Sequence, residues 1–215
     1  MREYFDKELT QLNDSLIEMG GLVEQAIKNT MKMIVDGEDL LDIARGHENR
    51  INEAEKSIQS RCLHLLLHQA PVAHDLRYVS AALKMITDLE RIGDQAVDIA
   101  EMSVYIKDKK QVFNLTHILE MGDNASKMVT EAIDAFVKSD IEVAKRVARQ
   151  DDIVDELFSR SKNETVELIH NNKELGSEAV DIVMIAKYLE RIADHAVNVA
   201  EWVAFSITGS CDLSD

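Results

Sequence analysis

One acidic phrase occurs twice in the sequence. The first copy is DLERIGDQAVDIAE, and the second, one hundred positions later, is YLERIADHAVNVAE. Each copy holds a glutamate followed four residues later by an aspartate, Glu90 with Asp94 and Glu190 with Asp194. Residues four apart lie on one face of an α-helix, so each pair places two carboxylates side by side. Paired oxygens suit hard cations such as Mg, Mn or iron, and Zn less strongly.

Further acids extend both pairs. Glu101 falls between Glu90 and Asp94 on the helical wheel, and Asp98 lies about 40° beyond Asp94. Glu201 repeats Glu101 in the second copy, whereas Asn198 replaces Asp98. We therefore treat Asp98, Glu101 and Glu201 as weaker metal-ligand candidates.

The apolar residues that precede the first phrase share its face. These are Leu76, Val79, Leu83 and Ile86. The pattern predicts that an apolar stripe facing the helical bundle runs into the acids. A partly buried carboxylate needs a compensating partner, which is an arginine, a proton or a metal ion.

One helix cannot complete a coordination shell, so a second set of acids must face each pair. Asp151 and Asp155 have the same spacing, although the register one residue later also fits. Earlier in the chain, Glu48 is followed four residues later by Asn52, a weaker neutral ligand. His195, inside the second phrase, is a candidate nitrogen ligand, but its counterpart is a glutamine.

Local ion pairs are the alternative interpretation of these acids. Arg91 is three residues from Asp94, as is Arg191 from Asp194, and Lys187 is three residues from Glu190. Such pairs are common on helix surfaces and hold no metal. The recurrence of the acids favours a site, because several neighbouring basic residues are not repeated.

Composition predicts an all-α protein. The 215 residues include eight glycines and a single proline, so few residues interrupt helices. Six long helical runs are expected, with the first three repeated by the last three: 3–35, 40–69, 72–106, 112–137, 141–170 and 177–207. Two repeats of this length favour two similar three-helix bundles, at residues 1–108 and 109–215, packed together.

Charge and targeting signals restrict the function. The net charge of −16 argues against nucleic-acid binding, which depends on Lys and Arg. No segment has the length and hydrophobicity of a signal peptide or a membrane span. The two cysteines, Cys62 and Cys211, suit a reducing compartment. We therefore expect a cytoplasmic protein without membrane insertion.

An enzyme of the carboxylate-bridged di-iron class is a second alternative. That class also uses helical bundles with paired acids, but it requires a Glu-x-x-His motif. Neither ERIGD nor ERIAD is followed by a histidine at that spacing. We expect no catalytic residues.

The sequence resembles the PhoU family of phosphate-uptake regulators over its entire length. The resemblance rests on the E/D-x-x-x-D signature, present as ERIGD, DDIVD and ERIAD. It implies two three-helix bundles related by a pseudo-twofold axis, with metal ions (Fe, Zn, Mn or Mg) on the signature acids. The implied ligands are Glu48, Glu90, Asp94, Asp151, Asp155, Glu190 and Asp194.

The same resemblance implies a regulatory role. Members of the PhoU family act as cytoplasmic negative regulators of phosphate uptake and of the phosphate-starvation response, and they often form homodimers. Their partners are the ATPase of the phosphate ABC transporter and the sensor histidine kinase of the phosphate response, which bring them to the inner face of the membrane. A helical adaptor with salt-bridged acids and no metal is the competing hypothesis.

Overall fold

The chain is almost entirely helical. The computed structural model describes residues 2–68, 72–106 and 117–213, which form six long α-helices, one 3₁₀ turn and no strand. The helices are α1 (Arg2–Asp36), α2 (Leu41–His68), α3 (Ala73–Val104), α5 (Ile118–Lys138), α6 (Ile141–Asn171) and α7 (Gly176–Thr208). The all-α prediction is confirmed. Residues 112–116 of the fourth predicted run, and the predicted boundary after residue 108, lie outside the described residues.

The predicted breaks between helices have clear local causes. Gly37 adopts a positive φ of 73° after α1, where its lack of a side chain avoids strain. Asp140 caps the start of α6, because its side chain accepts hydrogen bonds from the backbone N–H groups of Glu142 and Val143. Asn172 likewise caps the short 3₁₀ turn between α6 and α7.

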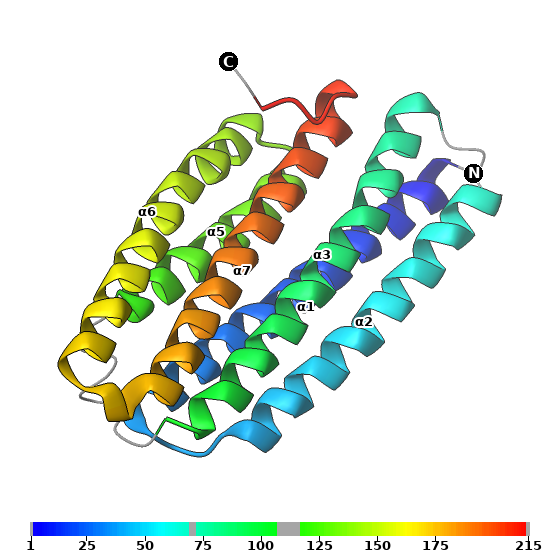
Figure 1. Cartoon of the computed structure of the whole chain (residues 1–215). Coiled ribbons are helices and arrows are strands. Elements are labelled where there is room, and N and C mark those ends of the chain that lie inside the picture. Colours follow the sequence, from blue (N-terminus) through cyan, green and yellow to red (C-terminus); the bar gives the residue numbers. More distant parts are fainter. Residues whose placement is uncertain (1, 69–71, 107–116, 214–215) are drawn as a thin grey trace.

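The helices form two three-helix bundles in two layers. Helices α2, α3, α7 and α6 lie side by side in that order, and α1 and α5 lie behind them (Figure 1). Helices α1 to α3 pack together as one bundle, and α5 to α7 as the other. The most extensive contact of all joins α3 to α7, which run antiparallel, and α1 also meets α5. Both contacts between bundles join equivalent helices, as a pseudo-twofold axis requires.

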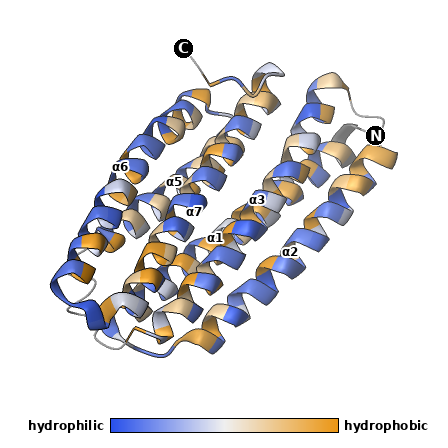
Figure 2. Cartoon of the chain, viewed as in Figure 1, coloured by the Kyte–Doolittle hydropathy of each residue, from blue (hydrophilic) through white to orange (hydrophobic). Residues whose placement is uncertain are grey.

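The core lies between the layers and continues past the acidic phrase. Hydrophilic residues follow much of α2 and α6, the outer helices of the four-helix layer (Figure 2). On α3, Val79 and Ile86 are buried as predicted, but Leu76 is 47% exposed. Leu89 and Ile92 carry the buried seam alongside the acids. The prediction that carboxylates replace the apolar stripe is therefore wrong, since they flank it instead.

Glycines allow the helices to approach closely at equivalent places. A Cβ atom on Gly20 of α1 would lie 2.5 Å from the side chain of Ile133, and one on Gly122 of α5 would lie 2.5 Å from that of Met31. In the first contact the glycine belongs to α1 and the larger side chain to α5, and in the second contact the reverse holds. A Cβ atom on Gly93 of α3 would lie 2.8 Å from Ile51 of α2. Gly93 thereby brings α2 against α3 beside the first acidic pair.

No helix in the described ranges has the length and apolar character needed to cross a membrane.

The contact between Gly93 and Ile51 predicts a compensating pair of substitutions. The equivalent positions of the second bundle hold Ala193 and Val154, both fully buried. Gly93→Ala should destabilise the protein by about 1 kcal/mol, because overpacking costs more than the gain in helix propensity. Adding Ile51→Val should recover much of this loss. Thermal unfolding of the four proteins in this double-mutant cycle measures the coupling.

Gly46→Ala is the matched control. Gly46 lies within α2, and no atom lies within 4 Å of a Cβ atom placed there. This substitution should stabilise the protein by up to ~1 kcal/mol, which raises the midpoint of unfolding by about 2–4 °C. Additive effects of Gly93→Ala and Ile51→Val would contradict the proposed contact.

Candidate functional site

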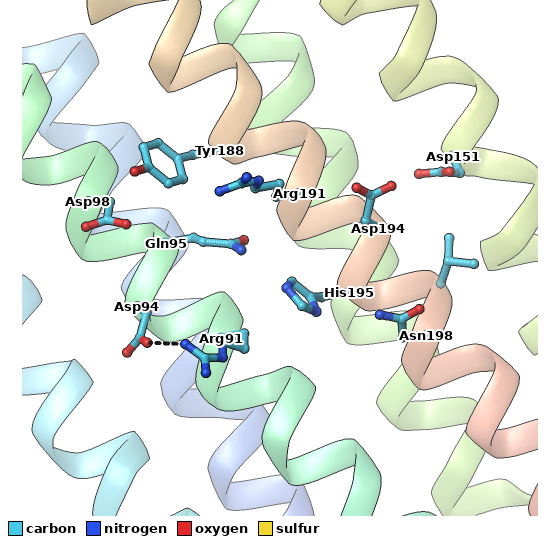
Figure 3. A pocket seen from close by; sticks show the side chains of 11 residues that line it. Arg91, Asp94, Gln95, Asp98, Asp151, Tyr188, Arg191, Asp194, His195 and Asn198 are labelled. Atoms are coloured by element: carbon cyan, nitrogen blue, oxygen red, sulfur yellow. Dashed lines mark ion pairs between the residues drawn. The ribbon is translucent and has the colours of Figure 1, made fainter.

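The second acidic pair lies opposite the acids of the fifth helical run. Asp151 and Asp155 of α6 interact electrostatically with Glu190 and Asp194 of α7. Figure 3 shows the side chains of Asp151 and Asp194 pointing toward one another between the two helices. We call these four acids the α6–α7 carboxylate cluster. It contains the pair and the facing pair that the sequence predicted for the second bundle.

Asp151 is the most strongly perturbed acid of this cluster. Burial raises its pKa to about 6, and the negative charges of Asp155, Asp194 and Glu190 contribute to the increase. The adjacent Asp152 is exposed and has a smaller influence. Asp151 Oδ1 is also buried without a hydrogen-bond partner. The register that begins at Asp151 therefore faces α7, and its carboxylate lacks a compensating group.

A lysine partly neutralises the other side of the cluster. Lys187 contacts both carboxylate oxygens of Glu190, whose side chain is only 12% exposed. Burial raises the pKa of Asp194, and Glu190 adds to this effect while Lys187 opposes it. The predicted local ion pair of Lys187 is thus present. Within the described residues, this lysine forms no ion pair with Asp151 or Asp194.

The first bundle holds an equivalent arrangement, the α2–α3 carboxylate cluster of Glu48, Glu90 and Asp94. Burial raises the pKa of Glu48, and Asp94 contributes next. Burial also raises the pKa of Glu90, followed by the effect of Asp94, while Arg91 opposes the increase. Arg91 lies 3.6 Å from Glu90 and 3.7 Å from Asp94, so both ion pairs are loose.

Asn52 lies at the position equivalent to Asp155. Its Oδ1 atom is buried without a hydrogen-bond partner, as is Oδ1 of Asp151. A buried oxygen without a donor is costly, so each atom has unused capacity to bind a cation or a proton donor. Because Asn52 is neutral, the α2–α3 cluster has one carboxylate fewer than the α6–α7 cluster.

The residues of both clusters fit a hard cation. All their donors are oxygens, several carboxylates carry raised pKa values, and two buried oxygens have no partner. In the described part of the chain, no three His, Cys, Asp or Glu side chains are arranged closely enough to enclose a metal ion. The clusters therefore supply suitable ligands on facing helices without a closed cage.

Glu101 and His195 have other partners, whereas Glu201 lies near a like charge. Glu101 pairs with Arg45 of α2 at 2.7 Å. Burial raises the pKa of Glu201, with a further contribution from Asp88. His195 donates or accepts a hydrogen bond through Nδ1 with Asp88 of α3 at 2.9 Å, so it points away from the α6–α7 cluster.

A cavity of about 730 Å³ opens along part of the contact between α3 and α7, between the two clusters. Its walls include Arg91, Gln95 and Asp98 of α3, and Tyr188 and Arg191 of α7 (Figure 3). The spacing along the sequence predicted these arginines only as partners of acids on their own helices. Arg191 makes no ion pair with Asp194 within the described residues, so that predicted pair is absent. The repeated spacing of residues 88, 91, 95 and 98 with 188, 191, 195 and 198 was the signal for this second face.

Asp151→Asn should stabilise the metal-free protein at pH 7. The folded-state pKa of about 6 exceeds the usual value for aspartate, so this group favours folding at low pH and the benefit is lost as the pH rises through 6. After discounting for solvent screening, we expect about 1 kcal/mol, or about 2–4 °C in the unfolding midpoint. The variant should also vary less in stability between pH 4 and pH 7, as measured by thermal unfolding in chelator.

Asp152→Asn removes the same charge from an exposed neighbour and should change the midpoint much less. A lower midpoint for Asp151→Asn at pH 7 would show that the charged carboxylate has a stabilising partner.

Comparisons with known proteins agree with this architecture. The model of the PhoU domain matches residues 16–103 and 118–203, one match in each bundle. The chain is 32% identical to the "Phosphate-specific transport system accessory protein PhoU homolog" of Clostridium acetobutylicum, over 100% of this chain and 99% of that protein. It is 31% identical to the homolog of the same description from Pseudomonas aeruginosa, over 97% of this chain and 87% of that protein.

Two crystal structures share the fold. PhoU from Pseudomonas aeruginosa has a TM-score of 0.89 at 32% identity, covering 96% of this chain and 100% of that chain. The phosphate transport system regulatory protein PhoU from Streptococcus pneumoniae has a TM-score of 0.88 at 25% identity, covering 98% and 99%. The matched domains, the full-length identity and the shared architecture together show that the chain belongs to the PhoU family.

Proposed function

We propose that this chain is a negative regulator of phosphate uptake and of the phosphate-starvation response. In this role it acts as a cytoplasmic adaptor between the phosphate ABC transporter and the sensor histidine kinase. The observation that carries the proposal is the full-length match to relatives described as accessory proteins of a phosphate-specific transport system. An adaptor needs binding surfaces and no reaction of its own, and the helical bundles supply such surfaces.

The carboxylate clusters give the adaptor a means to respond to cations. We propose that Asp151, Asp155, Glu190 and Asp194 hold divalent or iron-type ions in the second bundle. Glu48, Glu90 and Asp94, with Asn52, would do so more weakly in the first. A bound cation would neutralise the repulsion that raises the pKa of these acids and would link α6 to α7 or α2 to α3.

The competing function is an adaptor whose acids are purely structural. The contact of Lys187 with Glu190 and the pair of Arg45 with Glu101 support this alternative. The unpartnered Oδ1 atoms of Asp151 and Asn52 favour the metal-binding proposal, because the ion pairs leave them unsatisfied. Homodimer formation is a further expectation from the family.

Replacing one acid in each cluster should reduce metal content. Asp94→Ala combined with Asp194→Ala should lower the metal bound after reconstitution by at least half, because each helix loses a ligand. The helices should remain, since removing like charges relieves repulsion. Elemental analysis by mass spectrometry and circular dichroism measure the two quantities.

Asp123→Ala combined with Asp134→Ala is the matched control. Both residues are exposed on α5, and the double variant removes the same charge. It should keep the wild-type metal content. Equal metal content in all three proteins, or none in the wild type after reconstitution, would favour the structural role of the acids.

Deletion of the gene tests the regulatory proposal in cells. Without the repressor, phosphate-starvation genes should be expressed in phosphate-rich medium. A transcript measurement checks this, and complementation with the intact gene should restore repression. Unchanged expression in a strain that has no second copy of such a gene would contradict the proposal.

A further inference from the structure

Helices α3 and α7 present equivalent polar stripes to each other across the cavity between them. On α3 the stripe consists of Asp88, Arg91, Gln95 and Asp98, and on α7 of Tyr188, Arg191, His195 and Asn198. These positions are three, seven and ten residues apart, which places each stripe on one helical face. Seven of the eight residues line the cavity. The eighth, Asp88, forms hydrogen bonds with His195 and Asn198, which line it.

Contacts between the helices close both ends of this seam. At one end, Asp88 Oδ1 lies 2.9 Å from His195 Nδ1 and accepts a hydrogen bond from Asn198 Nδ2 at 3.1 Å. At the other end, burial raises the pKa of Asp98, and a hydrogen bond from Tyr188 opposes that increase. Because the helices are antiparallel, the two contacts occupy pseudo-symmetric positions. They leave the middle of the seam to other residues.

The two arginines of the seam are only weakly paired. Arg191 interacts electrostatically with Asp98 but makes no ion pair in the described ranges, and its guanidinium lies over the Tyr188 ring at 5.9 Å. Among the described residues, Arg91 forms ion pairs only with Glu90 and Asp94 of its own helix, both of them loose. Figure 3 shows Arg191, His195 and Gln95 extending into the space between α3 and α7. The two arginines are equivalent residues of the repeat, one from each bundle.

Gln95 supplies a second and independent indication of a ligand. It is only 8% exposed, it lines the cavity, and its Oε1 atom is buried without a hydrogen-bond partner. A buried amide oxygen without a donor costs free energy comparable to a lost hydrogen bond. A ligand that fits this site must therefore accept hydrogen bonds from guanidinium groups and donate one to an amide oxygen.

The aspartates around the cavity do not occupy its middle. Asp94 lies near Arg91, and Asp98 lies near Tyr188. Asp194 points toward Asp151, on the side of α7 that faces α6 (Figure 3). The lining of the cavity thus combines two arginines and an amide near its centre with four carboxylates at its edges. This local arrangement offsets the unfavourable net charge of the whole chain, because short-range hydrogen-bonded pairs outweigh distant, screened charges.

We propose that the middle of this cavity binds inorganic phosphate between Arg91 and Arg191. The forked guanidinium groups match the oxygens of a tetrahedral oxyanion. Phosphate near neutral pH keeps at least one proton, which it donates to Gln95 Oε1. The arrangement alone indicates a protonated oxyanion, and the choice of phosphate rests on the proposed function. Binding would join equivalent residues of the two bundles and so couple phosphate to their packing.

Binding of phosphate to the purified, chelator-treated protein tests the proposal. Isothermal titration calorimetry with EDTA present removes any phosphate held through metal ions on the carboxylate clusters. Arg191→Gln should weaken phosphate binding about tenfold or more, because a charge-assisted contact is lost. Arg191→Lys should weaken it less, since the charge remains while the fork is lost. Gln95→Met should weaken it several-fold.

Arg160→Gln is the control for charge. Arg160 pairs with Glu156 on α6 and does not line the cavity, so its replacement should leave phosphate affinity within about twofold. Sulfate, which carries no proton at neutral pH, should bind at least about tenfold more weakly than phosphate because it cannot donate to Gln95. Circular dichroism of each variant verifies that the helices are retained.

Three results would overturn the assignment. They are the absence of phosphate binding by the wild type at millimolar concentration, unchanged affinity in Arg191→Gln, and tighter binding of a nucleotide than of phosphate at the same residues. The proposed regulatory function is tested separately by gene deletion. A protein that represses starvation genes but fails to bind phosphate would refute the cavity assignment alone.

Discussion

Repulsion between half-buried carboxylates of neighbouring helices is the constraint on which the site depends. Asp151 and Asp194 face each other across α6 and α7, and burial raises the pKa values of both. The charges of Asp155 and Asp194 add to the increase at Asp151, and those of Glu190 and Asp155 add to the increase at Asp194. The surrounding helices hold them there, because Val154 and Ala193 between the acids are completely buried. Packing thus fixes a charge arrangement that is unfavourable without a cation or a proton. Such an arrangement is typical of sites that exchange ions.

The repeat gives two such clusters, but with unequal chemistry. Asn52 replaces the acid found at position 155, and Lys187 contacts Glu190 where the first bundle has Thr87. The seam between the bundles is equally asymmetric, since His195 stands where the first bundle has Gln95. Duplication therefore preserves the scaffold, while substitutions at equivalent positions give each cluster its own affinity and charge.

Much of this structure is predictable from the sequence because helices are local. The repeat and its breaks predicted the long helices, and the four-residue spacing placed Glu90 beside Asp94 and Asp151 opposite α7. The α3–α7 seam was not predicted, because local spacing favoured pairs such as Arg191 with Asp194 on one helix. Which face of α7 meets α3 depends on packing between residues about one hundred positions apart. The close approach at Gly93 likewise depends on its neighbour on α2.

The role proposed for the two clusters depends on cation binding by their facing carboxylates. Anomalous X-ray diffraction from crystals grown with manganese tests it most directly, because Mn²⁺ takes carboxylate and amide oxygens as ligands. Metal coordination by these acids predicts an anomalous peak between Asp151 and Asp194, and a weaker one or none beside Asn52. Fully occupied manganese at other surface acids, with no peak at either cluster, would contradict it.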